Sequence, residues 1–228
     1  MKFSDRSKRR ISRPHLDRSF QTGYGSADHR NWKHPPMPWK KNFDVDVARD
    51  RAKALFWSKG YEATSMEDLL GCMDINRGSF YATFGSKQAL YLDVLQRYDQ
   101  HYRCGVLDQL KAEFTPREAI LTLFEAVRKE AAGAKGTRGC FLANATMELA
   151  ASDKSVAKIV GVAFSQTEAF FKAMIEHGQA DGTIRASADP DVVARSLLGL
   201  LLGMRVLARG GSPAPVLESI VQQVKELL

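Results

Sequence analysis

From residue 45 to the end of the chain, apolar residues recur mainly at spacings of three and four, the period of an α-helix that buries one face. The first such segment stops at Gly60, a residue type that commonly ends helices, and its apolar positions are Val45, Ala48, Ala52, Leu55 and Phe56. No segment alternates convincingly at period two, as a half-buried strand would. The pattern therefore predicts an all-α fold.

Capping residues and glycines divide residues 60–92 into short helices. Thr64 or Ser65 begins one helix, and acidic residues stand in its first turn, where the helix dipole favours them. A break at residues 74–76 precedes a helix over 77–84, and Gly85-Ser86 separates it from a longer helix. Short helices joined by a three-residue break within about forty residues are typical of a helix-turn-helix unit.

Longer helices are predicted over 116–132, 141–150, 155–179, 190–209 and 214–228. We therefore expect three parts: a basic, disordered arm over residues 1–42, an N-terminal three-helix helix-turn-helix domain over 43–92, and a larger helical domain over 93–228.

The basic character of the chain lies in the arm. Residues 1–41 carry a net charge of +8 and the remainder −1, within a formal total of +7. Residues 42–92 hold six basic and seven acidic side chains, so charge alone does not predict nucleic-acid binding by the folded part. The arm itself has two interpretations. It binds DNA phosphates or a minor groove, or the natural protein begins at Met37.

The sequence contains no pattern typical of several classes of function. It has no phosphate-binding loop, no Ser/His/Asp set and no metal cluster, so neither an enzyme nor a cofactor is predicted. His101 and Cys104 lie one turn apart without a third ligand in view. The three cysteines form no C-x-x-C pair, which favours a reducing cytoplasm. The most apolar segment, residues 196–204, is too short to cross a membrane.

The helix over residues 77–84 has the properties of a helix that inserts into DNA. Phe80 and Phe84 lie four apart on one face and are expected to pack against Leu55 and Leu69. The polar and small residues are left for DNA: Arg77, Gly78, Ser79, Tyr81 and Thr83.

Residues 54–95, and the motifs KGYEATS, RGSFYATF and GSKQAL within them, resemble the DNA-binding signature of the TetR family of transcription regulators. The resemblance implies a regulator, taken as a repressor, that binds a palindromic operator as a homodimer. A small molecule bound to the C-terminal domain would release the operator. One departure is Asp74, where the family usually has glycine; aspartate tolerates a left-handed conformation, so we expect the turn to survive.

The resemblance also implies roles for single residues. Thr64 and Ser65 would contact phosphate at a helix start, and Lys87 would contact another. Arg77, Gly78, Ser79 and Tyr81 would face the major groove, with the phenol of Tyr81 on a phosphate. Arg77 is the expected base reader, because a guanidinium can bond guanine O6 and N7 together.

The last two predicted helices are the expected homodimer interface. The helix over 190–209 is apolar nearly all round and carries Gly199 and Gly203, which permit close approach of another helix. Together with residues 214–228 it is expected to form a two-fold four-helix interface. The alternative is an ordinary core within one chain.

Candidate effector-binding residues lie on the central helices, and many of them are equally compatible with ordinary core. The effector itself, the operator sequence and the sign of regulation are not predicted, and a helical scaffold is the alternative function. Cys140 is a further candidate for sensing oxidants or electrophiles, since a helix start lowers a thiol pKa. The effector candidates are Phe124, Val127, Cys140, Phe141, Asn144, Met147, Glu148, Phe164, Phe170, Phe171 and Met174.

Overall fold

The computed structural model describes residues 43–133 and 138–228, which belong to one compact unit. Within these ranges the regular elements are all helical, so the predicted all-α class is confirmed. The expectations for the arm, residues 1–42, lie outside the described residues.

The helix-turn-helix segment contains four helices, and their starts lie close to the predicted positions. They are α1 (Val45–Lys59), α2 (Met66–Met73), α3 (Arg77–Phe84) and α4 (Lys87–Tyr98). Beyond α4 the chain continues through a π-helix (Asp99–Cys104) into α5 (Gly105–Glu113). A π-helical turn widens the helix locally and is often found at functional sites.

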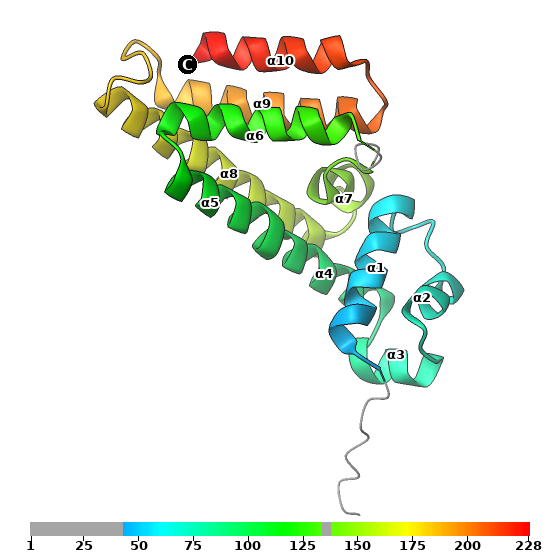
Figure 1. Ribbon diagram of the computed structural model, residues 1–228. Coiled ribbons are helices and arrows are strands. Elements are labelled where there is room, and N and C mark those ends of the chain that lie inside the picture. Colours follow the sequence, from blue (N-terminus) through cyan, green and yellow to red (C-terminus); the bar gives the residue numbers. More distant parts are fainter. Residues whose placement is uncertain (1–42, 134–137) are drawn as a thin grey trace, which may run out of the picture. The chain divides into compact units, whose positions relative to one another are not determined.

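The remaining helices also begin and end near the predicted residues. They are α6 (Pro116–Ala131), α7 (Phe141–Leu149), α8 (Lys154–Ala180), α9 (Pro190–Arg209) and α10 (Ala214–Leu227). In Figure 1, α6, α9 and α10 lie together with α8 crossing beside them, while α1, α2 and α3 lie at the opposite end of the unit. None of the described helices is long and apolar enough to cross a membrane.

Local sequence explains the start of each short helix. The side chains of Asp44, Ser65, Asn76 and Ser86 each accept a hydrogen bond from a backbone N–H in the first turn that follows. Asp74 ends α2 in the left-handed conformation, with φ 57° and ψ 49°, as the sequence predicted for this departure from glycine.

Two apolar cores fill the described unit. One contains residues of α5, α6, the second half of α8, α9 and α10. The other joins α1–α4 to α7 and the first half of α8; Phe141 of α7, for example, packs edge-on against Tyr91 of α4 with ring centroids 5.6 Å apart. The core beneath the helix-turn-helix thus extends past residue 92, the predicted domain boundary, because α7 covers its inner side.

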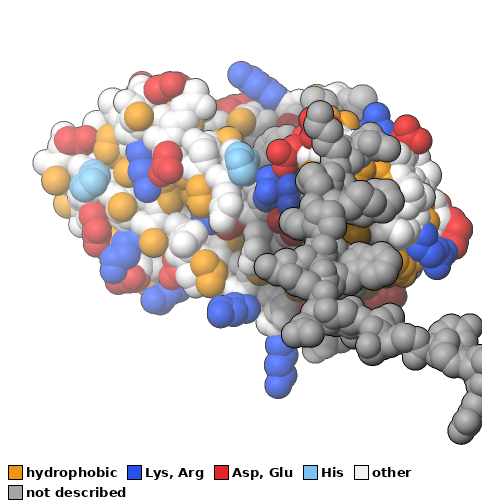
Figure 2. Space-filling view, turned by 90° about the horizontal axis from the view of Figure 1, so that it is seen from below, with side chains coloured by type: hydrophobic (Ala, Val, Ile, Leu, Met, Phe, Trp, Pro, Cys, Tyr) orange, Lys and Arg blue, Asp and Glu red, His pale blue; other side chains and the backbone are white. Residues whose placement is uncertain are grey.

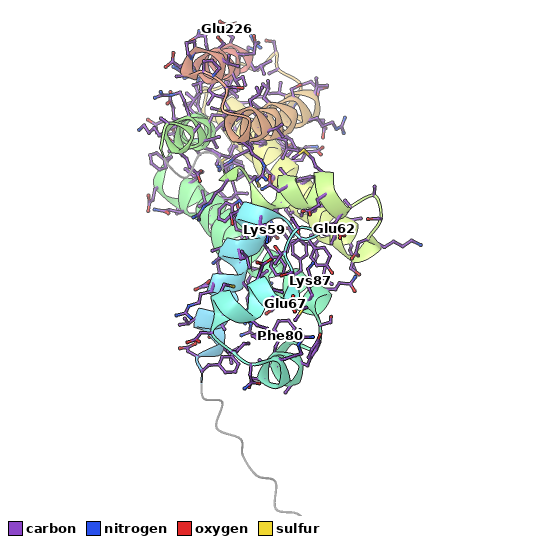
Figure 3. All side chains as sticks on the ribbon, turned by 90° about the vertical axis from the view of Figure 1, so that its right-hand side faces the viewer. Lys59, Glu62, Glu67, Phe80, Lys87 and Glu226 are labelled. Carbon is purple, nitrogen blue, oxygen red and sulfur yellow. The ribbon has the colours of Figure 1, made fainter. Side chains whose placement is uncertain are left out.

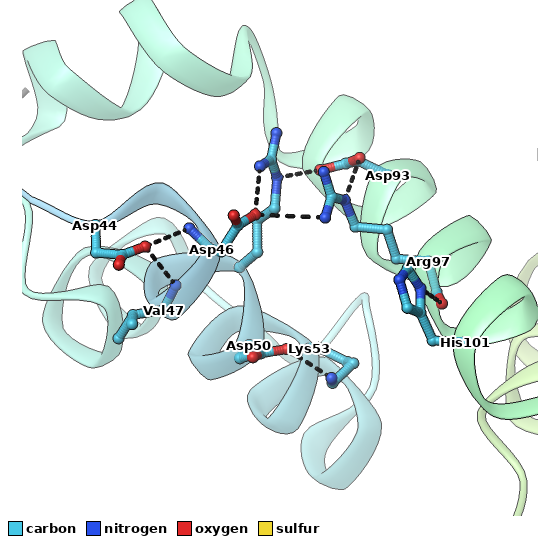
Figure 4. A network of polar contacts seen from close by, with 9 residues as sticks. Asp44, Asp46, Val47, Asp50, Lys53, Asp93, Arg97 and His101 are labelled. Carbon is cyan, nitrogen blue, oxygen red and sulfur yellow. Dashed lines mark hydrogen bonds and ion pairs between the residues drawn. The ribbon is translucent and has the colours of Figure 1, made fainter.

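Ion pairs also hold α1 against α4 (Figure 4). Arg49 bonds Asp46 at 3.0 Å on its own helix and Asp93 of α4 at 2.6 Å. Arg97 returns from α4 to Asp93 at 3.2 Å and to Asp46 at 3.4 Å. These exposed and half-buried pairs orient the two helices, although each contributes little to stability in water.

Candidate nucleic-acid interface and internal cavity

α3 presents a polar outer face above two aromatic anchors. Phe80 is completely buried and Phe84 is 8% exposed, and their rings lie 5.6 Å apart. Phe80 shares its core with Leu69, while Leu55 is only partly buried at its edge. The outward residues of the helix are Arg77, Gly78, Tyr81 and Ala82, with Ser79 and Thr83 half-buried.

Tyr81 stands out from α3 as a large exposed aromatic side chain. It is 45% exposed, and its ring meets the ring of Phe80 edge-on at 5.4 Å. The contact with Phe80 holds the ring while the phenol faces solvent. This arrangement can donate a hydrogen bond to a phosphate without rearrangement of the helix.

Arg77 has a protein partner in this structure. One of its terminal nitrogens lies 2.9 Å from Oε1 of Glu67 at the start of α2, and both side chains are more than half exposed. An exposed ion pair of this kind is worth little. The guanidinium can therefore exchange the carboxylate for a base edge at small cost.

Thr64, predicted to contact phosphate, points inward in this structure. Its side chain is completely buried, and its hydroxyl donates to the carbonyl oxygen of Gly60 at 2.5 Å. Its backbone N–H donates to the carbonyl oxygen of Tyr61 at 3.2 Å. In this conformation both groups are bonded inside the loop before α2, so a phosphate contact by Thr64 would require these bonds to be exchanged.

Ser65 caps α2 through a reciprocal pair of bonds. Its hydroxyl accepts from the N–H of Asp68 at 3.0 Å, and the Asp68 carboxylate accepts from the N–H of Ser65 at 2.8 Å. Lys59 also donates to this carboxylate, and the bonds from Lys59 and Ser65 lower the pKa of Asp68 to about 2. The N–H groups of Met66 and Glu67 have no partner among the described residues, so they remain available at the helix start.

Lys87 lies at the start of α4 with its ammonium above an aromatic ring. Its Nζ is 4.2 Å from the ring centroid of Tyr61, which belongs to the loop between α1 and α2. This cation–π contact holds the charge in place without neutralising it. In the view of Figure 3, Lys87 lies below Lys59 and Glu62 and above Phe80.

The charge distribution adds little to the case for DNA binding. Figure 2 shows basic and acidic side chains interspersed over the described part of the face seen from below. This agrees with the near-neutral count for residues 42–92. The geometry of α2, α3 and the start of α4 therefore defines the candidate interface.

Four of the residues predicted to bind an effector lie on α7, and they differ in burial and in partners. Phe141 is buried in the aromatic core, Met147 is 61% exposed, and Asn144 donates to the carbonyl oxygen of Arg138. Glu148 bonds the backbone of the loop between α1 and α2. The four side chains line a shallow pocket together with residues of α1, and Glu148 and Phe141 also contact α1 or the loop after it.

A cavity of about 130 Å³, partly open to solvent beside the exposed Val106, lies among α4–α9. Cys140 and Phe164 line it, whereas Phe124 and Phe171 are buried in the neighbouring core and do not. Its walls are mainly leucine, with a few polar groups that sequence reasoning missed. Those lining groups are Tyr98, Arg103, Thr167 and Arg205.

The polar groups of the cavity already have partners. Arg205 of α9 bonds Glu130 of α6, and Arg103 bonds Asp99 and Gln166. The Tyr98 hydroxyl lies 3.9 Å from the Cys140 sulfur, and burial raises the pKa of Tyr98 well above its ordinary value. A basic residue directly after the apolar run at 196–204 was the available signal for Arg205.

Among residues 43–133 and 138–228, no group of three or more His, Cys, Asp and Glu side chains is placed to hold a metal ion. His101 instead lies with Nδ1 2.9 Å from the carbonyl oxygen of Arg97.

Comparison with known proteins assigns this arrangement to a family. Residues 49–94 match the family model of bacterial regulatory proteins of the tetR family, and residues 116–222 match tetracyclin repressor-like C-terminal domains. The HTH-type transcriptional repressor ComR of Escherichia coli (strain K12) is 31% identical over 183 residues, which are 80% of this chain and 86% of that protein. The chain belongs to the TetR family.

Solved structures agree with the TetR assignment. A cysteine mutant of the TetR family regulator CifR, complexed with 26-bp operator DNA, has a TM-score of 0.72 and 27% identity over 81% of this chain and 97% of that one. The reduced form of E. coli NemR has a TM-score of 0.73 at 21% identity, over 80% and 95% of the two chains, which shows the shared fold. This TetR-family chain is thus a DNA-binding regulator of transcription, in a family of regulators and not of enzymes.

Proposed function

We propose that this TetR-family protein is a repressor that binds a palindromic operator as a homodimer in the bacterial cytoplasm and releases it when a small molecule occupies the cavity among α4–α9. The observation that carries the proposal is the outer face of α3, where exposed polar residues stand on two buried phenylalanines. ComR, the relative described above, carries the name of a repressor.

The proposed DNA contacts divide into two groups. Ser65, the N–H groups at the start of α2, Tyr81 and Lys87 bind phosphates and set the register on the duplex. Arg77, Gly78, Ser79 and Thr83 face base edges in the major groove, and Arg77 reads a guanine after leaving Glu67. Thr64 is absent from this set because its hydroxyl is buried.

The proposed homodimer interface is formed by α9 and α10. Val192, Val206 and Leu207 of α9 are 57%, 42% and 36% exposed, and Val216 of α10 is 40% exposed. Gly199 and Gly203 lie on α9 with no atom of another element within 4 Å of an added Cβ, so a partner helix could approach closely there. Two recognition helices must reach successive major-groove faces about 34 Å apart, which one chain cannot do.

The proposed effector is a small and mainly apolar molecule. The cavity walls come from leucine, valine and phenylalanine side chains, and the few polar groups would orient the ligand. A molecule larger than the cavity would push the surrounding helices apart and change the distance between the two α3 helices. Affinity for ligand and for DNA would then be coupled reciprocally.

The test is selection of duplex sites from a random library, followed by affinity measurement on the selected site. Arg77→Ala is expected to cost about 1–3 kcal/mol per specific contact and to relax the preference at one base pair of each half-site. Lys111→Ala, which removes the same charge from α5, is expected to leave the preference unchanged. Selection of no sequence by the wild-type protein would overturn the function and leave the helical scaffold.

A further inference from the structure

Glu148, near the end of α7, bonds the loop that precedes α2. Its Oε2 accepts from the backbone N–H of Tyr61 at 3.1 Å, and its Oε1 accepts from the N–H of Glu62 at 2.9 Å. Both carboxylate oxygens are therefore used on two successive N–H groups of one loop. An anion held by adjacent backbone N–H groups in this way makes two charge-assisted hydrogen bonds.

The same junction is shaped to admit this carboxylate. Gly60 has φ 89°, and a Cβ added there would lie 2.9 Å from Oε1 of Glu148. A second bond joins the two elements, because Nε1 of Trp57 on α1 donates to the carbonyl oxygen of Gly139 just before α7 at 3.1 Å. α7 therefore holds the end of α1 and the following loop at two points.

The loop held by Glu148 positions two groups proposed to bind phosphate. Tyr61 provides the first bonded N–H, and its ring makes a cation–π contact with Lys87, whose Nζ lies 4.2 Å from the ring centroid. The Thr64 hydroxyl ties the other end of the loop to Gly60, directly before the cap of α2 at Ser65. A displacement of Tyr61 would thus move Lys87, and a displacement of Gly60 would move the start of α2.

We propose that Glu148 is a positioning residue for operator binding: it does not contact DNA, and it places the phosphate-binding groups at the starts of α2 and α4. The inference rests on the proposed function, because it concerns the same DNA interface. α7 also contributes Leu142 to the cavity wall, so one helix borders both the cavity and the loop.

Electrostatics makes the proposal sharply testable. Removal of a negative charge from a DNA-binding protein ordinarily strengthens its attraction to DNA. Glu148→Gln removes a charge, and it leaves one acceptor oxygen where two N–H donors need one each. If the carboxylate acts through geometry, this variant binds DNA more weakly despite the more favourable charge.

The experiment measures affinity for the selected operator at several salt concentrations for the wild type, Glu148→Gln, Lys87→Ala and the double variant. Glu148→Gln is expected to weaken binding about tenfold, in line with removal of a hydrogen bond to a charged group. The slope of log K against log salt is expected to become shallower by about 0.9 for each phosphate that the variant no longer binds. Lys87→Ala is expected to weaken binding less in the Glu148→Gln background than alone, because the two residues act on the same phosphate.

Glu113→Gln is the matched control, since its carboxylate on α5 accepts only from Gln109 of the same helix among the described residues. It is expected to keep wild-type affinity and salt slope, and thermal unfolding of each variant shows whether the fold persists. Unchanged or tighter binding by Glu148→Gln, with the wild-type slope, overturns the inference while leaving the proposed function intact. Failure of the wild type to bind any selected duplex overturns the proposed function itself.

Discussion

Thr64 illustrates how one residue type at a helix start suits two different roles. A threonine before a helix can bond a phosphate or the protein's own backbone, and the motif is the same in both cases. The neighbouring loop decides between them here, because Thr64 is completely buried and donates to Gly60. Ser65, one residue later, remains exposed. The distinction between these neighbours has a measurable consequence.

Thr64→Val keeps the shape of the side chain and removes the hydroxyl. We expect the free energy of unfolding to fall by about 1 kcal/mol, because the Gly60 carbonyl loses its donor. The salt slope of operator binding should stay at the wild-type value, since Thr64 binds no phosphate. Thr64→Ser serves as the control, because serine keeps the hydroxyl. A shallower slope for Thr64→Val, with unchanged stability, would return this residue to the phosphate-binding set.

At the scale of single elements, α2 owes its two ends to different devices. Its start depends on the reciprocal bonds of Ser65 and Asp68, and its end on the left-handed conformation of Asp74. Both features follow from residue types, and both help to set the orientation of α3. Changes at either end should therefore affect stability through a known cause.

Asp74→Ala is expected to destabilise the protein by about 1–2 kcal/mol, the cost of a left-handed conformation for a residue with a Cβ and no local polar compensation. Asp74→Asn should be nearly neutral, because asparagine adopts this conformation readily. Chemical denaturation of the three proteins gives the comparison. Equal stability of the alanine and asparagine variants would contradict the explanation.

Asp68 gives the start of α2 a pH dependence. Its pKa is lowered from 3.8 to about 2 by bonds from Lys59 and Ser65. A carboxyl whose pKa is depressed on folding stabilises the protein above its unfolded pKa and loses that contribution as pH falls through the folded value. The difference in melting temperature between the wild type and Asp68→Asn should thus be largest above pH 3.8 and shrink toward pH 2. A difference that is constant with pH would exclude the ionised carboxylate as its source.

At the scale of the whole molecule, the proposed function requires two copies of the chain. Val192 and Val206 of α9 are 57% and 42% exposed, and the same helix carries the glycines that would admit a partner helix. DNA affinity should therefore depend on association through this surface.

Val206→Glu places a charge on the proposed interface. We expect it to raise the dimer dissociation constant by roughly a hundredfold or more, because burial of an unpaired charge is costly. Operator affinity should fall in parallel. Val162→Glu, at a valine of α8 that is 49% exposed, is the control and should remain dimeric. Sedimentation at several concentrations measures the association, and a dimeric Val206→Glu protein would rule out this face of α9.

The sequence by itself determined the local features of this protein. Helical periodicity, caps and glycines predicted the ends of most helices to within a few residues, although not the π-helix or α5. The spacing of Phe80 and Phe84 predicted the outward face of α3. These succeed because caps, turns and amphipathic faces depend on residues within about one turn of each other.

Tertiary structure decided everything that depends on residues far apart in the chain. It buried Thr64, placed Phe124 and Phe171 in the core, brought Arg103 and Arg205 to one cavity, and set Glu148 against a loop 86 residues earlier. Glu148 was predicted as an effector contact only from its place on a central helix, and its bonds to the loop before α2 could not be seen from the sequence. Its two N–H donors become neighbours only when α7 packs against α1, and no local pattern in the sequence encodes that packing.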